Sequence, residues 1–216
     1  MVLLTIFQLL VSRYAASEKV IVGTDLANRF PPETEDLIGF FVNVVPMVAD
    51  FSDHPTLDAA LAWTKSCVLQ AFANSDLPFD RIAETAASKS PLVQFLFVMQ
   101  HPAQPLPAIP GIVLERHEIA PVGAKFDLAV FLRDLDGEIS IEWLYRTDLF
   151  SASAVARFAK HFEVLLRAAL AAPATPLNLL RHVGEQEEQE RERSRAHGRN
   201  AKMDLLKKAK RQGEFA

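Results

Sequence analysis

Six histidines are the side chains in this sequence best suited to acid–base or metal chemistry, and their spacing indicates neither. They are His54, His101, His117, His161, His182 and His197. No two are adjacent or separated by three or four residues, the spacing that places two imidazoles on one helix face. His54 has an acid four residues on, Asp58, but Pro55 and Thr56 favour a loop entering a helix, where Asp58 complements the helix dipole. We expect His161 to occupy a partly exposed helix position.

Other reactive residue types give no catalytic set. Asp76, Asp80 and Glu84 have ligand chemistry for a metal ion, but their place at a predicted helix start favours a solvated acidic turn. The single cysteine, Cys67, excludes an internal disulfide and a multi-cysteine zinc site, and we expect an inert thiol on an apolar helix face. There is no Gly-x-Ser-x-Gly string, phosphate-binding glycine loop or dinucleotide fingerprint. Spacing alone therefore predicts no catalytic residue and no metal site.

Composition narrows the class of protein. The chain has 216 residues, of which 50% are hydrophobic and 23% charged, typical of a globular domain with a core. Its net charge of −4 gives no reason to expect nucleic acid or an anionic membrane as a partner. The apolar run at residues 1–11 is too short to cross a bilayer and is expected to be a buried helix. A single cysteine fits a reducing cytoplasm.

The pattern of apolar residues predicts alternating helices and strands. In the first helix, the buried stripe is Leu3, Phe7, Leu10 and Tyr14, with Gln8 and Ser12 off the stripe. A strand is expected at residues 19–24, an apolar run follows at 38–46, and a helix capped by Thr56 at 56–72. A further helix is expected from residue 78, and a strand at 92–100.

The clearest local signal is a β-hairpin. Apolar residues alternate over 126–133 and again over 139–146, with a turn at 134–137 between them. Ser151 is expected to cap a last long helix with the buried stripe Val155, Phe158, Phe162, Leu165 and Leu166. These elements predict an α/β fold, an α+β sandwich in which helices flank a mixed, largely buried sheet.

The composition changes near residue 185. Residues 185–216 hold 9 basic and 7 acidic side chains, whereas residues 1–184 hold 14 basic and 20 acidic ones. We therefore predict a domain at 1–184 and a charged tail or linker at 185–216. Two interpretations of the tail stay open: a solvated segment, or a short amphipathic docking helix at 203–211.

Six strings in order resemble condensation domains of non-ribosomal peptide synthetases. Residues 20–29 resemble the family's VGT-x-x-AxR, 38–43 its IGxFVN, and 74–80 its HQDxPFE. Residues 90–94 resemble RxPLxQ, 125–128 KFDL, and 145–150 EYxTDLF. The matching residues expected to act structurally are Gly23, Thr24, Arg29, Pro78, Phe79, Asp80, Pro91, Gln94, Phe126, Asp127 and Asp148. The chain departs from the family at Asn74 and Ser75, which replace His-Gln, and at Val44, where Thr is common.

The resemblance implies one lobe, the C-terminal one, of a two-lobed fold like chloramphenicol acetyltransferase. Such domains form an amide between two carrier-bound thioesters. Their His-His-x-x-x-Asp-Gly motif belongs to the first lobe, and this sequence does not contain it. The resemblance therefore implies an acceptor-side half with no catalytic residue of its own. Gly39, Phe41 and Asn43 are expected at a substrate tunnel or lobe interface, or else as a strand irregularity and a satisfied buried amide.

Partners follow from the same resemblance. We expect a first-lobe polypeptide, a peptidyl carrier protein or both, and neither nucleic acid nor membrane. No cofactor is implied, since phosphopantetheine would arrive on the carrier proteins with the substrates. The alternatives are a non-catalytic interaction module or a truncated gene remnant that binds a carrier, a partner lobe or a tailoring enzyme. A lobe without its partner is expected to expose an apolar surface.

Overall fold

The computed structural model describes most of the body of the chain. The described residues are 1–29, 32–86, 91–100, 109–115, 117, 123–135 and 137–180. The expected boundary at residue 185 and the charged tail lie outside them.

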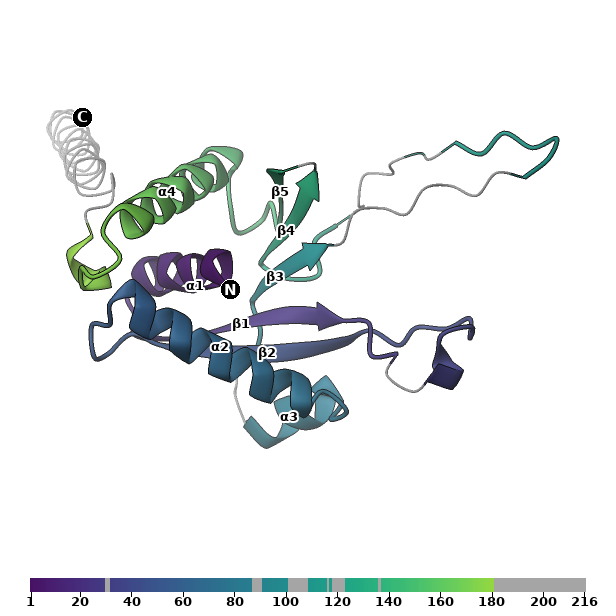
Figure 1. Cartoon of the computed structure of the whole chain (residues 1–216), viewed down its shortest axis with the longest axis horizontal. Helices are drawn as coiled ribbons and strands as arrows, with labels where there is room; N and C mark the ends of the chain where they lie inside the picture. Colours follow the sequence, from purple (N-terminus) through teal and green to yellow (C-terminus); the bar gives the residue numbers. More distant parts are fainter. Residues whose placement is uncertain are drawn as a thin grey trace, which may run out of the picture.

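Five strands form one mixed sheet in the order β2-β1-β3-β4-β5. They are β1 (Lys19–Leu26), β2 (Asn43–Asp50), β3 (Phe95–Gln100), β4 (Leu128–Leu135) and β5 (Glu138–Tyr145). The central pairs, β1 with β3 and β3 with β4, are parallel, and the two outer pairs are antiparallel. Because β1 and β3 run in the same direction, the segments that follow them leave the sheet at the same end, as Figure 1 shows.

The helices gather mainly on one face of the sheet. They are α1 (Val2–Ala15), α2 (Leu57–Ala73), α3 (Phe79–Ala86) and α4 (Ala152–Ala171), with short 3-10 turns η1 (Pro32–Thr34) and η2 (Leu177–Leu179). In Figure 1, α1 lies between α4 and α2, and it contacts both helices as well as β1. The smaller helix α3 lies near the start of β2. This arrangement is the predicted mixed sheet with flanking helices.

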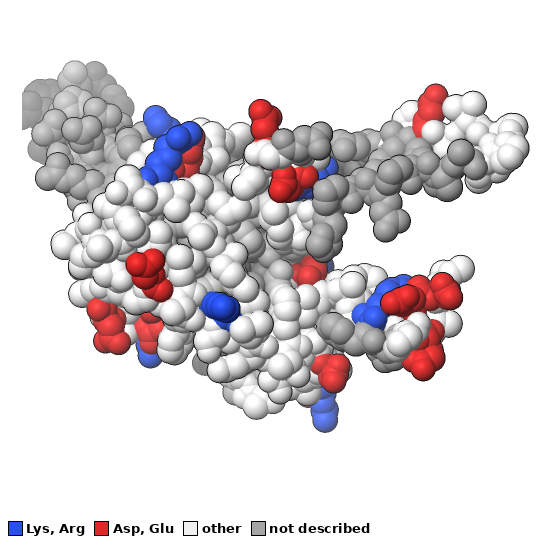
Figure 2. Space-filling view, viewed as in Figure 1, with Lys and Arg blue, Asp and Glu red and all other residues white. Residues whose placement is uncertain are grey.

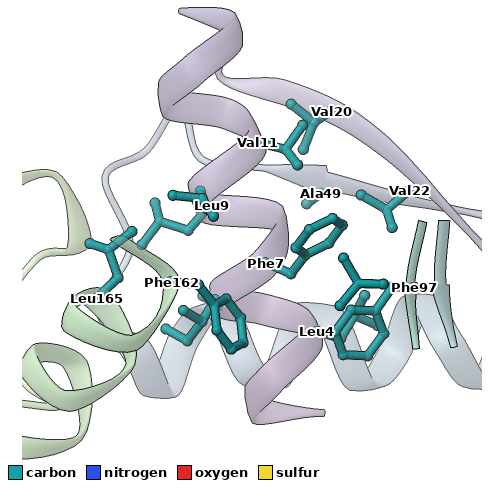
Figure 3. Close-up of a cluster of buried hydrophobic side chains, with 14 of the residues drawn as sticks. Leu4, Phe7, Leu9, Val11, Val20, Val22, Ala49, Phe97, Phe162 and Leu165 are labelled. Atoms are coloured by element: carbon teal, nitrogen blue, oxygen red, sulfur yellow. The ribbon is translucent and has the colours of Figure 1, made fainter. Parts of the chain in front are cut away.

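The core lies between α1 and the sheet. Figure 3 shows the Phe7 ring directed from α1 toward Val22 and Phe97 of the sheet, with Phe162 of α4 on the other side of the helix. The Phe7 and Phe97 ring centroids are 5.5 Å apart, and Phe7 also lies 6.2 Å from Trp143. These aromatic contacts join the central helix to β3, at the centre of the sheet, and to β5, at its edge.

The stripe predicted on the first helix is buried only in part: Phe7 and Leu10 are buried and Leu3 is half-buried, but Tyr14, at the end of the helix, is 42% exposed. Every residue from Leu4 to Ser12 is buried, including Gln8 and Ser12, which we expected to face away from the core. Gln8 donates to the Met47 carbonyl at 3.5 Å and Ser12 to the Ser17 carbonyl at 2.6 Å. The expectation was wrong because helices on both sides and the sheet beneath leave α1 with almost no solvent face.

The hairpin and the two helix caps are confirmed. Leu128 pairs with Tyr145 and Leu132 with Ile141 across β4 and β5, so the alternating apolar residues share one face. Thr56 accepts from the amide of Ala59, and Ser151 does the same for Ala154.

The apolar run at 38–46 divides into two unlike parts. Its second half enters β2, and its first half forms no strand and is largely exposed. Pro46 is accommodated because β2 is an edge strand, where a missing amide hydrogen need not break the ladder. Among the described residues, no helix is long and apolar enough to cross a membrane.

Candidate functional site

The histidines form no reactive cluster in the described parts of the chain. His54 lies in the loop after β2 with a φ of 48°, and the exposed His117 lies 3.7 Å from the Glu115 carboxylate. His161 was expected to be partly exposed and is instead buried, with its Nδ1 2.7 Å from the Tyr14 hydroxyl. No group of three or more metal-ligating side chains occurs within the described ranges. His101, His182 and His197 lie outside them.

Arg29 organises the segment that follows β1. We call residues 32–42 the arm, because they extend beyond the end of the sheet in Figure 1. The Arg29 guanidinium donates to the carbonyl oxygens of Thr34, Leu37 and Gly39, the last two at 2.9 and 3.2 Å. It also lies 4.3 Å from the centroid of the Phe41 ring. The Arg29 side chain therefore holds several parts of the arm together through contacts with its backbone and with one aromatic ring.

Gly39 and Phe41 both belong to the part of the arm that Arg29 contacts. A Cβ on Gly39 would lie 2.9 Å from the Phe41 ring, so a side chain there would displace the ring from its place beside Arg29. Gly39 itself is exposed, and Phe41 is half-buried. The structure thus brings together three residues of the VGT-like and IGFFVN strings, Arg29, Gly39 and Phe41.

Asn43 fastens β2 to the turn between α2 and α3. Its side-chain nitrogen donates to the carbonyls of Ser75 and Leu77 at 2.9 Å each, and its side-chain oxygen accepts from the Phe79 amide at 3.1 Å. The IGFFVN string therefore meets the string around Pro78, Phe79 and Asp80. Phe79 is half-buried at the first residue of α3, whereas Pro78 and Asp80 are exposed.

Close packing surrounds Gly23 on β1. A Cβ at this position would lie 2.6 Å from Val93 and 3.1 Å from Val44. Val93 is buried in the segment that enters β3, two residues after exposed Pro91. Thr24, the next residue, pairs with Val45 of β2. Gly23 therefore lets the RxPLxQ-like segment pack directly on the sheet.

A charged network lies at the start of β4. Asp127 precedes β4, and its carboxylate accepts from Gln94 at 3.3 Å and from Arg146 at 3.4 Å. Arg146 also binds Asp148 at 2.6 Å, and this pairing lowers the pKa of the Asp148 carboxyl. Three family-like strings meet here. The Phe126 ring beside them is half-buried, with the Lys125 ammonium 5.7 Å from its centroid.

A shallow hollow of about 480 Å³ borders this network. Its lining includes Gly123, Trp143, Leu144 and Arg146. The hollow is open to solvent, and the described part of the chain places no histidine in its wall. Acid–base chemistry at this end of the sheet therefore has no imidazole available from the described residues.

Exposed apolar side chains gather on the two segments that leave the arm end of the sheet. In the arm, Ile38 is fully exposed and Phe40 is 85% exposed. After β3, Val113 is 86% exposed and Ile112 is also exposed. Clustered exposure of large apolar side chains is typical of a surface that another protein covers.

The sequence of the chain matches the model of a known protein family. A family model described as "Condensation domain" matches residues 1–191. The chain belongs to the condensation domain family.

Relatives of this condensation domain chain are long synthases. A linear gramicidin synthase subunit of Brevibacillus parabrevis is 36% identical over 194 residues, which cover 87% of this chain and 2% of that protein. Surfactin synthase subunit 1 of Bacillus subtilis (strain 168) is 33% identical over 192 residues, covering 87% of this chain and 5% of that protein. The chain therefore spans a small fraction of the curated relatives it matches.

Solved structures share the fold. The X-domain from teicoplanin biosynthesis matches with a TM-score of 0.75 at 22% identity, over 83% of this chain and 43% of that one. The starter condensation domain of rhizomide synthetase matches with a TM-score of 0.72 at 12% identity, over 83% and 44% of the two chains. In both comparisons this condensation domain chain corresponds to less than half of the solved chain.

Two features of this condensation domain chain were not predicted from its sequence. Asp25 lies within β1, where burial raises the pKa of its carboxyl and nearby Lys125 partly opposes the shift. The aspartate inside an apolar strand was the signal that could have predicted a partly buried carboxyl. The hydrogen bond between Tyr14 and His161 was the other omission, although a hydroxyl at the end of an apolar stripe indicates a polar partner.

Proposed function

We propose that the chain is the acceptor-side, C-terminal lobe of a condensation domain that forms amide bonds in non-ribosomal peptide synthesis. The observation that carries this proposal is that residues of the family-like strings support a segment whose apolar side chains are exposed. The strings around Arg29 and Asn43 hold the arm in place, and the arm then presents Ile38 and Phe40 to solvent. A surface of this kind fits a lobe whose partner supplies the rest of the site.

In the proposed reaction, the amine of an acceptor attacks the thioester of a donor and forms an amide. The thiol of the donor's phosphopantetheine arm is the leaving group, and both substrates arrive on peptidyl carrier proteins. A histidine in His-His-x-x-x-Asp-Gly, on the first lobe, would position or deprotonate the amine. The same longer polypeptide or a separate one would supply that first lobe. This chain would contribute the wall opposite that histidine, with no catalytic residue of its own.

Reconstitution tests this function. The chain is mixed with a first-lobe polypeptide carrying His-His-x-x-x-Asp-Gly, together with a loaded donor carrier and a loaded acceptor carrier. Mass spectrometry of the acceptor carrier should detect the amide product only when both lobes are present. Failure of every cognate first lobe to give product would contradict the proposal, and so would product from this chain alone.

A second function is a non-catalytic module that recruits another protein. The chain also matches the complex of the X-domain and OxyB from teicoplanin biosynthesis, with a TM-score of 0.66 at 24% identity. That likeness supports a recruiting role for this fold. Stable binding of a tailoring enzyme, without amide formation in the reconstituted mixture, would favour this second function. A cytoplasmic location stays a prediction.

A further inference from the structure

Asp25 is a half-buried carboxylate to which no described residue donates a hydrogen bond. It lies near the end of β1, and its cross-strand neighbour on β2 is the apolar Val44. Burial raises the pKa of the Asp25 carboxyl, and the attraction of Lys125 only partly opposes that shift. A carboxylate that loses water without gaining a donor costs free energy, and a bound cation would offset this cost.

Asp25 faces away from the main helices. Val22 of the same strand packs into the core that α1 covers, and alternation along the strand turns Gly23 and Asp25 to the other face of the sheet. The three side chains nearest to an added Cβ on Gly23 are all aliphatic: Val93, Val44 and Leu96. The surface beside the Asp25 carboxylate is therefore apolar.

A notch in the molecular surface opens at the end of the sheet where β1 finishes. The arm follows β1, and the segment that contains residues 109–115 follows β3. Because β1 and β3 are parallel, both segments leave the sheet at this end, and Figure 2 shows a notch between them with acidic atoms at its inner end. A substrate that reaches the sheet between the two segments therefore passes the end of β1.

We infer that Asp25 is a specificity-determining residue that binds the terminal ammonium of an aliphatic side chain, such as that of lysine, on the acceptor substrate. This inference rests on the proposed function and adds the chemical class of the acceptor. The aliphatic stem of the substrate side chain packs on Val44, and its ammonium donates hydrogen bonds to the Asp25 carboxylate. The α-amine of the same acceptor stays free to attack the donor thioester.

The surroundings of Asp25 favour an ammonium over other ligands. A metal ion would need more ligands than this carboxylate, and the described ranges contain no group of three or more metal-ligating side chains. An anionic group would be repelled by the carboxylate. Lys125 is exposed and attracts the carboxylate from beyond ion-pair distance, which leaves room for a closer cation.

A comparison of two acceptors in the reconstituted pair of lobes tests the inference. Acceptor carriers are loaded with lysine or with α-aminoheptanoic acid, whose side chain has the same length and no charge, and kcat/KM for amide formation is measured for each. Wild type should prefer lysine by about tenfold or more, and Asp25→Asn should lose most of that preference, because it removes a hydrogen-bonded charge pair. Asp53→Asn, at an exposed aspartate after β2, is the matched control and should keep the preference.

Lys125→Gln gives a test with the opposite sign. Because Lys125 attracts the same carboxylate, its removal should strengthen the preference for lysine over the uncharged acceptor. A weaker preference in Lys125→Gln would show that Asp25 does not act as the cation-binding group, and it would overturn the assignment.

The outcomes separate this inference from the proposed function. Equal kcat/KM values for the two acceptors, or a preference for lysine that Asp25→Asn leaves intact, would overturn the inference and leave the function standing. Absence of amide formation with either acceptor and every cognate first lobe would overturn the function, and the inference with it.

Discussion

Asn43 and Phe79 are joined by a hydrogen bond in which the Phe79 amide donates to the Asn43 side-chain oxygen at 3.1 Å. The bond links the first residue of β2 to the first residue of α3. The nitrogen of the same Asn43 side chain donates to the carbonyls of Ser75 and Leu77. One side chain therefore fixes the α2–α3 turn against the arm end of the sheet.

Asn43→Ala should lower the free energy of unfolding by about 1–3 kcal/mol, because it leaves partly buried backbone groups without partners. Urea denaturation followed by circular dichroism measures the change. Asn74→Ala is the control. The exposed Asn74 side chain donates a hydrogen bond to the Gln70 carbonyl, and its loss should lower the free energy of unfolding by less. Equal effects of the two substitutions would contradict the role given to Asn43.

The sequence identified the two strings that Asn43 joins, but not that they meet. Alternation of apolar residues predicts a strand's faces, as it did for β4 and β5. A side-chain amide 36 residues from its partner leaves no such periodic signal, because its hydrogen bonds depend on how α2 returns to the sheet. The expectation of a satisfied amide came from residue type alone.

Gly23→Ala should destabilise the fold by about 1–3 kcal/mol, because the added methyl group would overlap Val93 on one side and approach Val44 on the other. Thermal unfolding of Gly23→Ala and of Gly23→Ala/Val93→Ala measures the effect. The second change makes room for the methyl group, so the penalty in the double variant should be smaller than the sum of the single penalties. Gly123→Ala is the control, because no atom of the described residues lies within 4 Å of its added Cβ. Additive penalties would show that the overlap is relieved elsewhere.

Asp25→Asn should make stability less dependent on pH. Burial raises the pKa of the folded Asp25 carboxyl above its ordinary value of 3.8. A raised pKa means that the folded state loses stability as pH rises from about 3.8 through the folded pKa. The variant should therefore gain a few tenths of a kcal/mol over wild type above this range, since the carboxyl is only partly buried, and the gain should vanish below it.

Urea unfolding at a series of pH values measures this difference, and Asp53→Asn corrects for the loss of one negative charge. A gain for Asp25→Asn that grew as the pH fell would reverse the assigned shift.

The apolar run at 38–46 shows that hydrophobicity alone does not predict which residues are buried in the chain's own core. Residues 38–42 and 43–46 are both rich in apolar side chains, yet the first group projects into solvent and the second enters the sheet. Apolar residues are placed inside a fold by burial in the chain's own core or by burial against a partner, and composition does not separate the two. The helix α1 shows the opposite case, since Gln8 is polar and still buried.

The central claim is that the working imidazole belongs to the first lobe. Single-turnover amide formation is measured in the reconstituted pair, with the second histidine of the first-lobe motif replaced by alanine, and separately with His54, His117 or His161 of this chain replaced. We predict a loss on the order of 10²-fold or more for the first-lobe change, and rates within about twofold of wild type for the three replacements in this chain. A 10²-fold loss on replacing His54 or His117, in a variant that folds like wild type, would contradict the account.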